Sequence, residues 1–181
     1  MKYLSMAVLL LLAACSSQPP VSFYQLPPVQ SVMTAPSAAA KGLFVEPVQV
    51  APYLNGRGLV LQVSSVELVM ARQHLWAEGL DQHLQRQLRK YIPLYTPAYF
   101  AQLQPSADSV RLTVQLDRFH GLVEGYAVLS GRFSLSSQAI VHSFDLRLPL
   151  LNDGYPAMVT ALGQGWEQLA QQIAQQLGNS A

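Results

Sequence analysis

Cysteine is nearly absent from this sequence, because Cys15 is the single one in 181 residues. A disulfide framework is therefore excluded, and a zinc site would have no second thiolate to complete it. The position of Cys15 close to the N-terminus needs an explanation of its own, which the residues before it provide.

Long apolar runs are also missing. A helix needs about 20 apolar residues to span a bilayer, and the apolar run from Met6 to Ala14 is shorter than that. Lys2 precedes this run, and the small residues Ala13 and Ala14 end it. This order is typical of a secretory signal, so residues 1–14 are predicted to be a signal peptide that is removed.

The segment Leu12–Cys15 has the form of a lipobox, in which small residues enter the signal peptidase and the cysteine thiol carries a diacylglycerol. Cys15 is thus predicted to be lipidated, and several acyl chains would make its membrane attachment effectively permanent. Ser16 stands where an aspartate would favour the inner membrane, so we expect an outer-membrane lipoprotein that faces the periplasm. The alternative, a buried cysteine in an unusual N-terminus, leaves the order of the preceding residues unexplained.

Charged side chains are scarce, at 12% of the chain, which is about half of the ~25% typical of soluble domains. Without Lys2, ten basic side chains face ten acidic ones, so the mature chain has no formal net charge. We therefore expect no nucleic-acid partner. The low charge favours protein partners or self-association, or else glutamine and serine provide the solvation.

Residues 16–42 are rich in proline, serine, alanine and glutamine. This composition cannot bury enough apolar area to fold alone, so residues 15–42 are predicted to be the lipidated cysteine and its tether. Within the tether, Phe23–Leu26 is an apolar island. It either adds a short edge strand to the domain or stays in a mobile tail, and we favour docking.

Strand patterns occupy much of the rest of the chain. Short apolar runs at Leu43–Val50, Leu59–Val63 and Val66–Met70 are separated by turn residues. Further on, apolar residues alternate with polar ones from Val110 to Asp117, and two more strands follow with apolar faces that include Ala127, Leu129, Phe133 and Leu135, then Ile140, Phe144, Leu146 and Leu148. Their tight spacing predicts an antiparallel meander.

Two segments show helical periodicity. In the first, Trp76, Leu80, Leu84 and Leu88 recur every four residues, and Pro93 is expected to end the helix. The second follows Asn152 and Asp153, which could cap it, and its apolar stripe comprises Leu162, Trp166, Leu169, Ile173 and Leu177. Its opposite face is rich in glutamine and has no basic residue, unlike a membrane-surface helix, so it should pack on the sheet. Gly163 and Gly165 would allow close packing there.

Together these elements predict one α+β domain over residues 43–178, with a mostly antiparallel sheet and two amphipathic helices packed on it. The chain is long enough for one core of this size and too short for two.

Motifs for catalysis, phosphate binding or metal binding are absent. The histidines His74, His83, His120 and His142 lack the spacing of metal ligands. The sequence has no nucleophile elbow, no phosphate-binding loop and no carboxylates whose spacing requires them to converge. We expect neither a catalytic site nor a cofactor or metal.

Aromatic residues gather between Tyr91 and Ser109, where Tyr95, Tyr99 and Phe100 lie among prolines. A loop of this length is uncommon unless it is functional or mobile. Rigid aromatic rings at a surface serve as interface anchors, so these three residues are a candidate partner interface. The alternative is that the rings cover one end of the core.

Several short motifs also resemble a known family, the auxiliary lipoproteins of MCE-type transport systems, called the PqiC or ABC-type transport auxiliary lipoprotein family. The likeness lies in Phe23–Leu26 soon after the cysteine, in Val48–Leu54 with the strand that follows, and in Trp76–Leu80. It covers most of the mature chain.

This resemblance implies a non-enzymatic, periplasm-facing subunit that is held in the outer membrane. It would work with an MCE protein that spans the periplasm and with an inner-membrane component, to move lipids between membranes and support envelope integrity. Self-association into a ring would fit this docking role. The alternatives are a small periplasmic lipid- or ligand-binding lipoprotein and a hydrolase with an unrecognised site.

Overall fold

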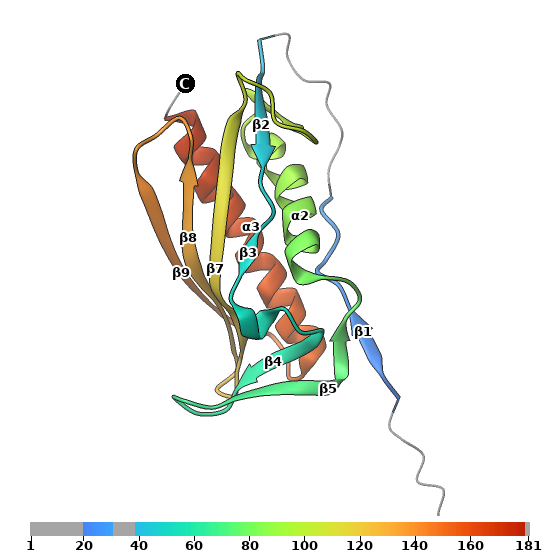
Figure 1. Cartoon of the computed structure of the whole chain (residues 1–181). Helices are drawn as coiled ribbons and strands as arrows, with labels where there is room; N and C mark the ends of the chain where they lie inside the picture. The colour runs from blue at the N-terminus through green and yellow to red at the C-terminus, as the bar shows by residue number, and fades with distance from the viewer. Residues whose placement is uncertain (1–19, 31–38, 180–181) are drawn as a thin grey trace, which may run out of the picture.

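The computed structural model describes residues 20–30 and 39–179, which form one mixed sheet with two long helices packed against it (Figure 1). The strands are β1 (Ser22–Tyr24), β2 (Lys41–Val45), β3 (Gln49–Val50), β4 (Gly58–Gln62), β5 (Leu68–Trp76), β6 (Tyr99–Gln102), β7 (Val110–Leu122), β8 (Tyr126–Leu135) and β9 (Val141–Pro149). The helices are α2 (Leu80–Tyr95) and α3 (Tyr155–Gly178), and a short 3-10 turn, η1, spans Pro52–Leu54. The predicted single α+β domain with two packed helices is confirmed.

Strand β7 organises the sheet. On one side it pairs antiparallel with β8, and β8 pairs antiparallel with β9, so the predicted meander is confirmed. On its other side β7 pairs in succession with β2, β3 and β4, all in parallel. The longest pairings are therefore antiparallel as expected, whereas the short pairings of β2, β3 and β4 with β7 are parallel. Strand β4 also forms an antiparallel hairpin with β5.

The core lies between the sheet and the two helices. Every residue of the predicted apolar stripe of α3 is buried, and the Trp166 ring meets the Phe119 ring edge-on with 6.1 Å between centroids. The Trp166 indole N–H donates to the carbonyl of Leu84 at 3.2 Å and so joins α3 to α2. Gly165 brings α3 close to the sheet, because a Cβ there would lie 2.2 Å from Leu129 Cδ2.

The first helix differs from its prediction at both ends. Trp76 is the last residue of β5, where its N–H donates to the carbonyl of Arg57 at 2.7 Å, and α2 begins at Leu80. Pro93 lies inside α2 and does not end it. The last turn persists because Ile92 is buried and its carbonyl accepts a hydrogen bond from the N–H of Thr96.

Two smaller expectations are also wrong. The residue that caps the N-terminus of α3 is Gly154, at φ 92°, and no side chain caps the helix. Asn152 and Asp153 therefore lie in the preceding connection, because the chain enters α3 through a left-handed conformation that favours glycine. Ile140 precedes β9 and is exposed, whereas the expected inward residues Phe144 and Leu148 are buried.

The N-terminal segment is docked on the domain over residues 20–30. Strand β1 pairs in parallel with the end of β5, which confirms the docked alternative for the apolar island. Leu26 is buried, and the carbonyl of Pro27 accepts a hydrogen bond from Gln87 Nε2 at 3.0 Å. The expected tether over 15–42 thus includes a docked strand, and Cys15 lies outside the described residues. Neither helix in the described part is long and apolar enough to cross a membrane.

Candidate functional site

The three aromatic residues of the predicted interface have different environments. Tyr99 lies in β6 and is 2% exposed, so for this residue the packing alternative holds. Phe100 follows it in β6 and is partly buried. Tyr95 ends α2 and is 39% exposed. Only Tyr95 and Phe100 therefore keep surface that a partner could contact.

Tyr95 is held in place by α3. Its hydroxyl donates to the carboxylate of Glu167, and its ring stacks on Tyr91 with 6.4 Å between centroids. Burial raises the pKa of Tyr91 to about 12, and the negative charge of Glu167 adds to the effect. Burial and the Glu167 carboxylate also raise the pKa of Tyr95. Both rings therefore stay neutral and form a fixed aromatic bridge between α2 and α3.

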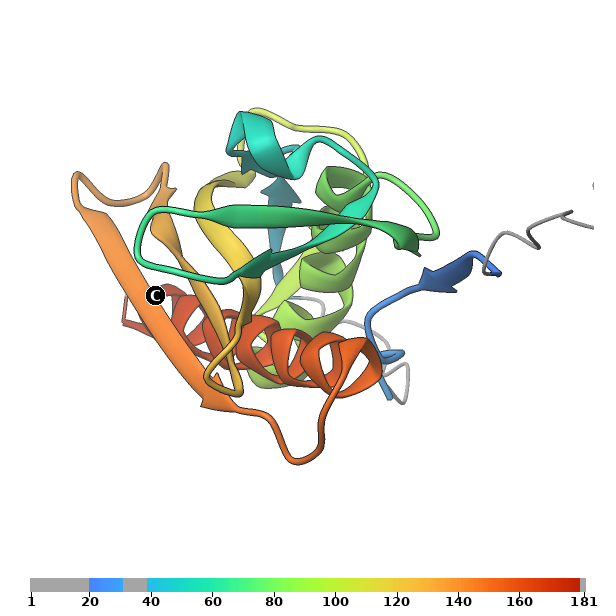
Figure 2. The ribbon, with the colours of Figure 1, turned by 90° about the horizontal axis from the view of Figure 1, so that it is seen from below.

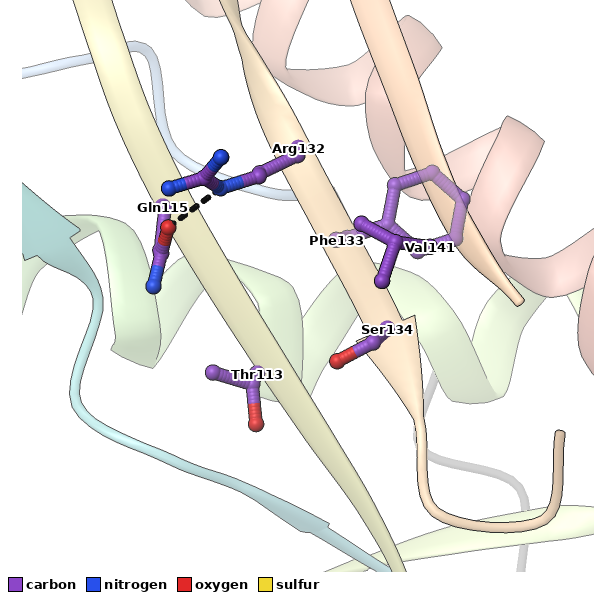
Figure 3. Close-up of a pocket in the computed structure, with 6 residues that line it drawn as sticks. All are labelled: Thr113, Gln115, Arg132, Phe133, Ser134 and Val141. Carbon is purple, nitrogen blue, oxygen red and sulfur yellow. Dashed lines mark hydrogen bonds between the residues drawn. The ribbon is translucent and has the colours of Figure 1, made fainter. Parts of the chain in front are cut away.

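A second candidate is the outer face of the sheet, which carries the polar side chains that alternate with the core residues of β7, β8 and β9. Arg118 donates two hydrogen bonds to the carboxylate of Asp145, both at 2.8 Å, and a third to Ser130 Oγ at 2.8 Å. Arg132 Nε donates to Gln115 Oε1 (Figure 3). We call this surface the open sheet face and define it by Thr113, Gln115, Arg118, Ser130, Arg132, Ser134 and Asp145.

The polar network of the open sheet face extends to the segment that follows β2. Thr113 Oγ1 donates to Glu46 Oε2 at 2.7 Å, and Gln115 Nε2 donates to Gln49 Oε1 at 3.0 Å. Side chains from four neighbouring segments are thus linked across the sheet. The alternation of polar residues in β7 was visible in the sequence. Their hydrogen-bond partners could not be predicted from it, because they lie up to 67 residues away.

A shallow pocket of ≈ 370 Å³ lies within the open sheet face. Its lining, shown in Figure 3, comprises Thr113, Gln115, Arg132, Phe133, Ser134 and Val141. The hydroxyl and amide groups can donate to and accept from a polar partner, and the guanidinium group can donate to it. The lining residues include neither a histidine nor a carboxylate.

The histidines are distributed over separate parts of the fold. His120 is buried, with Nδ1 3.1 Å from the carbonyl oxygen of Gly121. His83 contacts Glu78, which also pairs with Arg86, and these hydrogen bonds, that of Arg86 foremost, lower the pKa of Glu78. Over residues 20–30 and 39–179, no three His, Cys, Asp or Glu side chains gather to hold a metal ion.

The buried His120 should make stability depend on pH. Burial lowers the pKa of its imidazole below the ordinary 6.5, so the unfolded chain takes up a proton first as the pH falls. The free energy of unfolding should be greatest above pH 6.5 and decrease as the pH drops through 6.5 toward the folded-state pKa. Urea titrations from above pH 6.5 down to about pH 5 measure this.

The matched variants are His120→Gln and His142→Gln. His120→Gln should flatten the pH dependence in this window, whereas His142→Gln, on a partly exposed ring in β9, should keep it. An unchanged pH dependence in His120→Gln would assign the effect to another group.

Comparison with known proteins gives a family match over most of the chain. Residues 24–174 match the model of the ABC-type transport auxiliary lipoprotein component. The chain is 36% identical, over 97% of both chains, to proteins of Escherichia coli (strain K12) and Shigella flexneri that are each named intermembrane transport lipoprotein PqiC.

Solved structures agree with this match. A crystal structure of an uncharacterised protein is 37% identical, with a TM-score of 0.78, over 87% of this chain and 99% of that one. The crystal structure of protein XCC0632 from Xanthomonas campestris is 14% identical, with a TM-score of 0.63, over 88% of this chain and 100% of that one. The second likeness concerns the fold alone.

Proposed function

Because the chain belongs to the ABC-type transport auxiliary lipoprotein family, we propose that it is a non-enzymatic subunit of an MCE-type system for intermembrane lipid transport. Cys15 carries acyl chains that hold it in the outer membrane, and the domain faces the periplasm. There it receives an MCE-domain protein that spans the periplasm from an inner-membrane component. This role supports the integrity of the envelope.

The observation that carries the proposal is the full-length similarity to lipoproteins of intermembrane transport. Two features of this chain agree with it. Leu12–Cys15 has the form of a lipobox, which supports an anchor at Cys15, seven residues before the docked β1. The open sheet face offers paired polar groups and no catalytic set, which suits a receptor for another protein.

We assign partner binding to the open sheet face, with Arg132 at its centre. Arginine is enriched among residues that carry the energy of protein interfaces, and Arg132 is exposed between β7 and β9. Tyr95 and Phe100 are a second proposed contact with a partner. Self-association into a ring would repeat these surfaces around the end of the MCE protein.

Crosslinking in intact cells tests the proposed function. The tagged full-length chain is treated with a short crosslinker in its native host and purified from solubilised membranes, and captured proteins are identified by mass spectrometry. An MCE-domain protein should be among them. Repeated purification of a crosslinked, membrane-bound chain without any MCE-domain protein would overturn the proposal.

Arg132→Ala should reduce the yield of this crosslinked partner and change the free energy of unfolding by less than about 0.5 kcal/mol, as exposed substitutions generally do. Arg86→Ala is the matched control, because Arg86 is an exposed arginine on α2 that also has a polar partner, Glu78. Equal yields from the two variants would move the interface away from the open sheet face.

A further inference from the structure

Three connections carry exposed apolar residues at the end of the molecule that Figure 2 views from below. They are Val66 between β4 and β5, Val123 between β7 and β8, and Leu151 between β9 and α3, with exposed fractions of 91%, 61% and 80%. We call these three residues the apolar tips. Single exposed apolar residues are common on protein surfaces, but exposed apolar residues that gather on adjoining connections are typical of an interaction site.

Backbone hydrogen bonds join the three connections. The N–H of Val123 donates to the carbonyl of Gln62, at the end of β4, at 3.0 Å. The N–H of Leu150 donates to the carbonyl of Gly125, in the β7–β8 turn, at 2.9 Å. The three connections that carry the apolar tips are therefore held together by backbone hydrogen bonds and are not independent loops.

An apolar pocket of ≈ 210 Å³ lies behind the tips. Leu61, Leu122, Leu150 and Met158 line it, together with Tyr155 at the start of α3. The apolar character of this end thus continues from its tips into a recess.

The N-terminal strand lies at this same end. Ser22 pairs with His74, and the His74 ring stacks on Tyr155 with 4.1 Å between centroids. Since Tyr155 lines the apolar pocket, the chain that leads from Cys15 meets the domain beside the apolar tips. Figure 1 shows β1 at the same lower end as the β4–β5 hairpin.

The far end also exposes apolar residues, Leu103 and Ile140, so exposure alone does not select a membrane-facing end. The length of the segment between Cys15 and Ser22 selects that end. Cys15 precedes Ser22 by seven residues, which reach about 25 Å when fully extended. Helix α3 runs between the two ends and has 24 residues, a length of about 36 Å.

The direction of α3 is fixed by its contacts. Its first residue, Tyr155, lies at the end near β1, and the carbonyl of Gln176 near its last turn accepts a hydrogen bond from Gln138 Nε2, in the β8–β9 turn. With an anchor at Cys15, the β8–β9 turn cannot rest on the membrane, because Ser22 would then stand farther away than the chain reaches.

We propose that the apolar tips insert into the lipid monolayer that holds the acyl chains of Cys15. This inference rests on the lipid anchor of the proposed function and adds an orientation for the domain. Exposed apolar groups that enter a monolayer lie about 5–10 Å deep, at the boundary of headgroups and acyl chains. The open sheet face then stands roughly upright on the membrane, accessible from the side.

The charged residues around the apolar tips indicate which interactions hold the tips in the monolayer. Glu67, Glu124 and Asp153 are exposed on the same connections, and Arg147 pairs with Glu124 at 3.5 Å. An acidic surrounding does not attract an anionic membrane, so insertion depends on the apolar side chains and the acyl anchor. The contact should therefore persist at high salt, which weakens interactions between exposed charges.

Site-specific labelling tests the orientation. The full-length lipidated chain is reconstituted in vesicles of phosphatidylethanolamine and phosphatidylglycerol, with one introduced cysteine that carries an environment-sensitive fluorophore. Cys15 does not react with the label, because its sulfur is held in a thioether. The variants Val123→Cys and Ile140→Cys compare two positions that are each 61% exposed, and Leu151→Cys and Leu103→Cys compare positions at 80% and 78%.

Labels at Val123 and Leu151 should shift their emission to shorter wavelength and be quenched by lipids with spin-labelled acyl chains. Labels at Ile140 and Leu103 should show neither effect. Equal behaviour of both members of a pair would overturn the inference, and so would a shift at Val123 without quenching by lipids with spin-labelled acyl chains, which would assign the tips to contact with a second copy.

Flotation of the same vesicles separates this inference from the proposed function. A chain that floats but shows no quenching at Val123 and Leu151 overturns the orientation alone. A chain that does not float overturns the lipid anchor and the orientation with it.

Discussion

Replacing Trp166 with alanine should lower the free energy of unfolding by about 3–5 kcal/mol, as truncation of a fully buried tryptophan does. The ring has no exposed surface and lies where α3, α2 and the sheet meet, against Phe119. The substitution would leave a cavity there and remove the hydrogen bond to the carbonyl of Leu84. Urea denaturation followed by circular dichroism measures the loss.

Two further variants serve as references for the loss of free energy of unfolding in Trp166→Ala. Trp166→Phe keeps a ring in the core and should cost less than Trp166→Ala. Val66→Ala removes exposed apolar atoms and should be nearly neutral, within about 0.5 kcal/mol. A cost of Trp166→Ala as small as that of Val66→Ala would place the ring outside the cooperative core.

The position of Trp166 in the core could be predicted because α3 follows one simple rule. Its apolar residues recur at intervals of three and four, so they share the face that packs on the sheet. The alternation of apolar residues in β7 and β8 is equally regular and predicts a meander with one buried face. The local sequence pattern was sufficient to predict the buried residues of these elements, because each of them buries one face against one neighbour.

Trp76 shows where the local pattern misleads. It lies four residues before Leu80, and both are buried, so the spacing suggests a helix. The chain instead reaches Trp76 as the end of β5, paired with Tyr24 of β1. Contact with a segment 52 residues earlier decides its structure, and a short window of sequence does not include that partner.

The candidate site was partly predictable for the same reason. Tyr95 and Tyr99 look alike in the sequence, but the hydroxyl of Tyr95 finds Glu167 on α3, whereas Tyr99 enters the core through β6. The polar side of β7 could be predicted from its alternation. The cross-strand partners of Arg118 and Arg132 depend on strand register, which the sequence pattern does not specify.

The second large effect is expected at Cys15. Cys15→Ser, made with a secretion signal that is cleaved without lipidation in place of residues 1–14, should move the chain completely from the membrane fraction to the soluble periplasmic fraction, because serine cannot form the thioether to the diacylglycerol. Each buried acyl methylene contributes about 0.8 kcal/mol to membrane binding. The apolar tips on their own add too little apolar surface to replace several acyl chains. Fractionation on a density gradient, with metabolic labelling by an alkyne fatty acid, measures both attachment and lipidation.

Ser16→Asp is the matched control, because it keeps the lipid and changes the residue that follows it. This variant should remain labelled and membrane-bound but shift from the outer-membrane to the inner-membrane fraction. A Cys15→Ser chain that still sediments with membranes would contradict the anchor. In that case attachment would have to come from the domain itself, and the tips Val66, Val123 and Leu151 would be the first residues to replace.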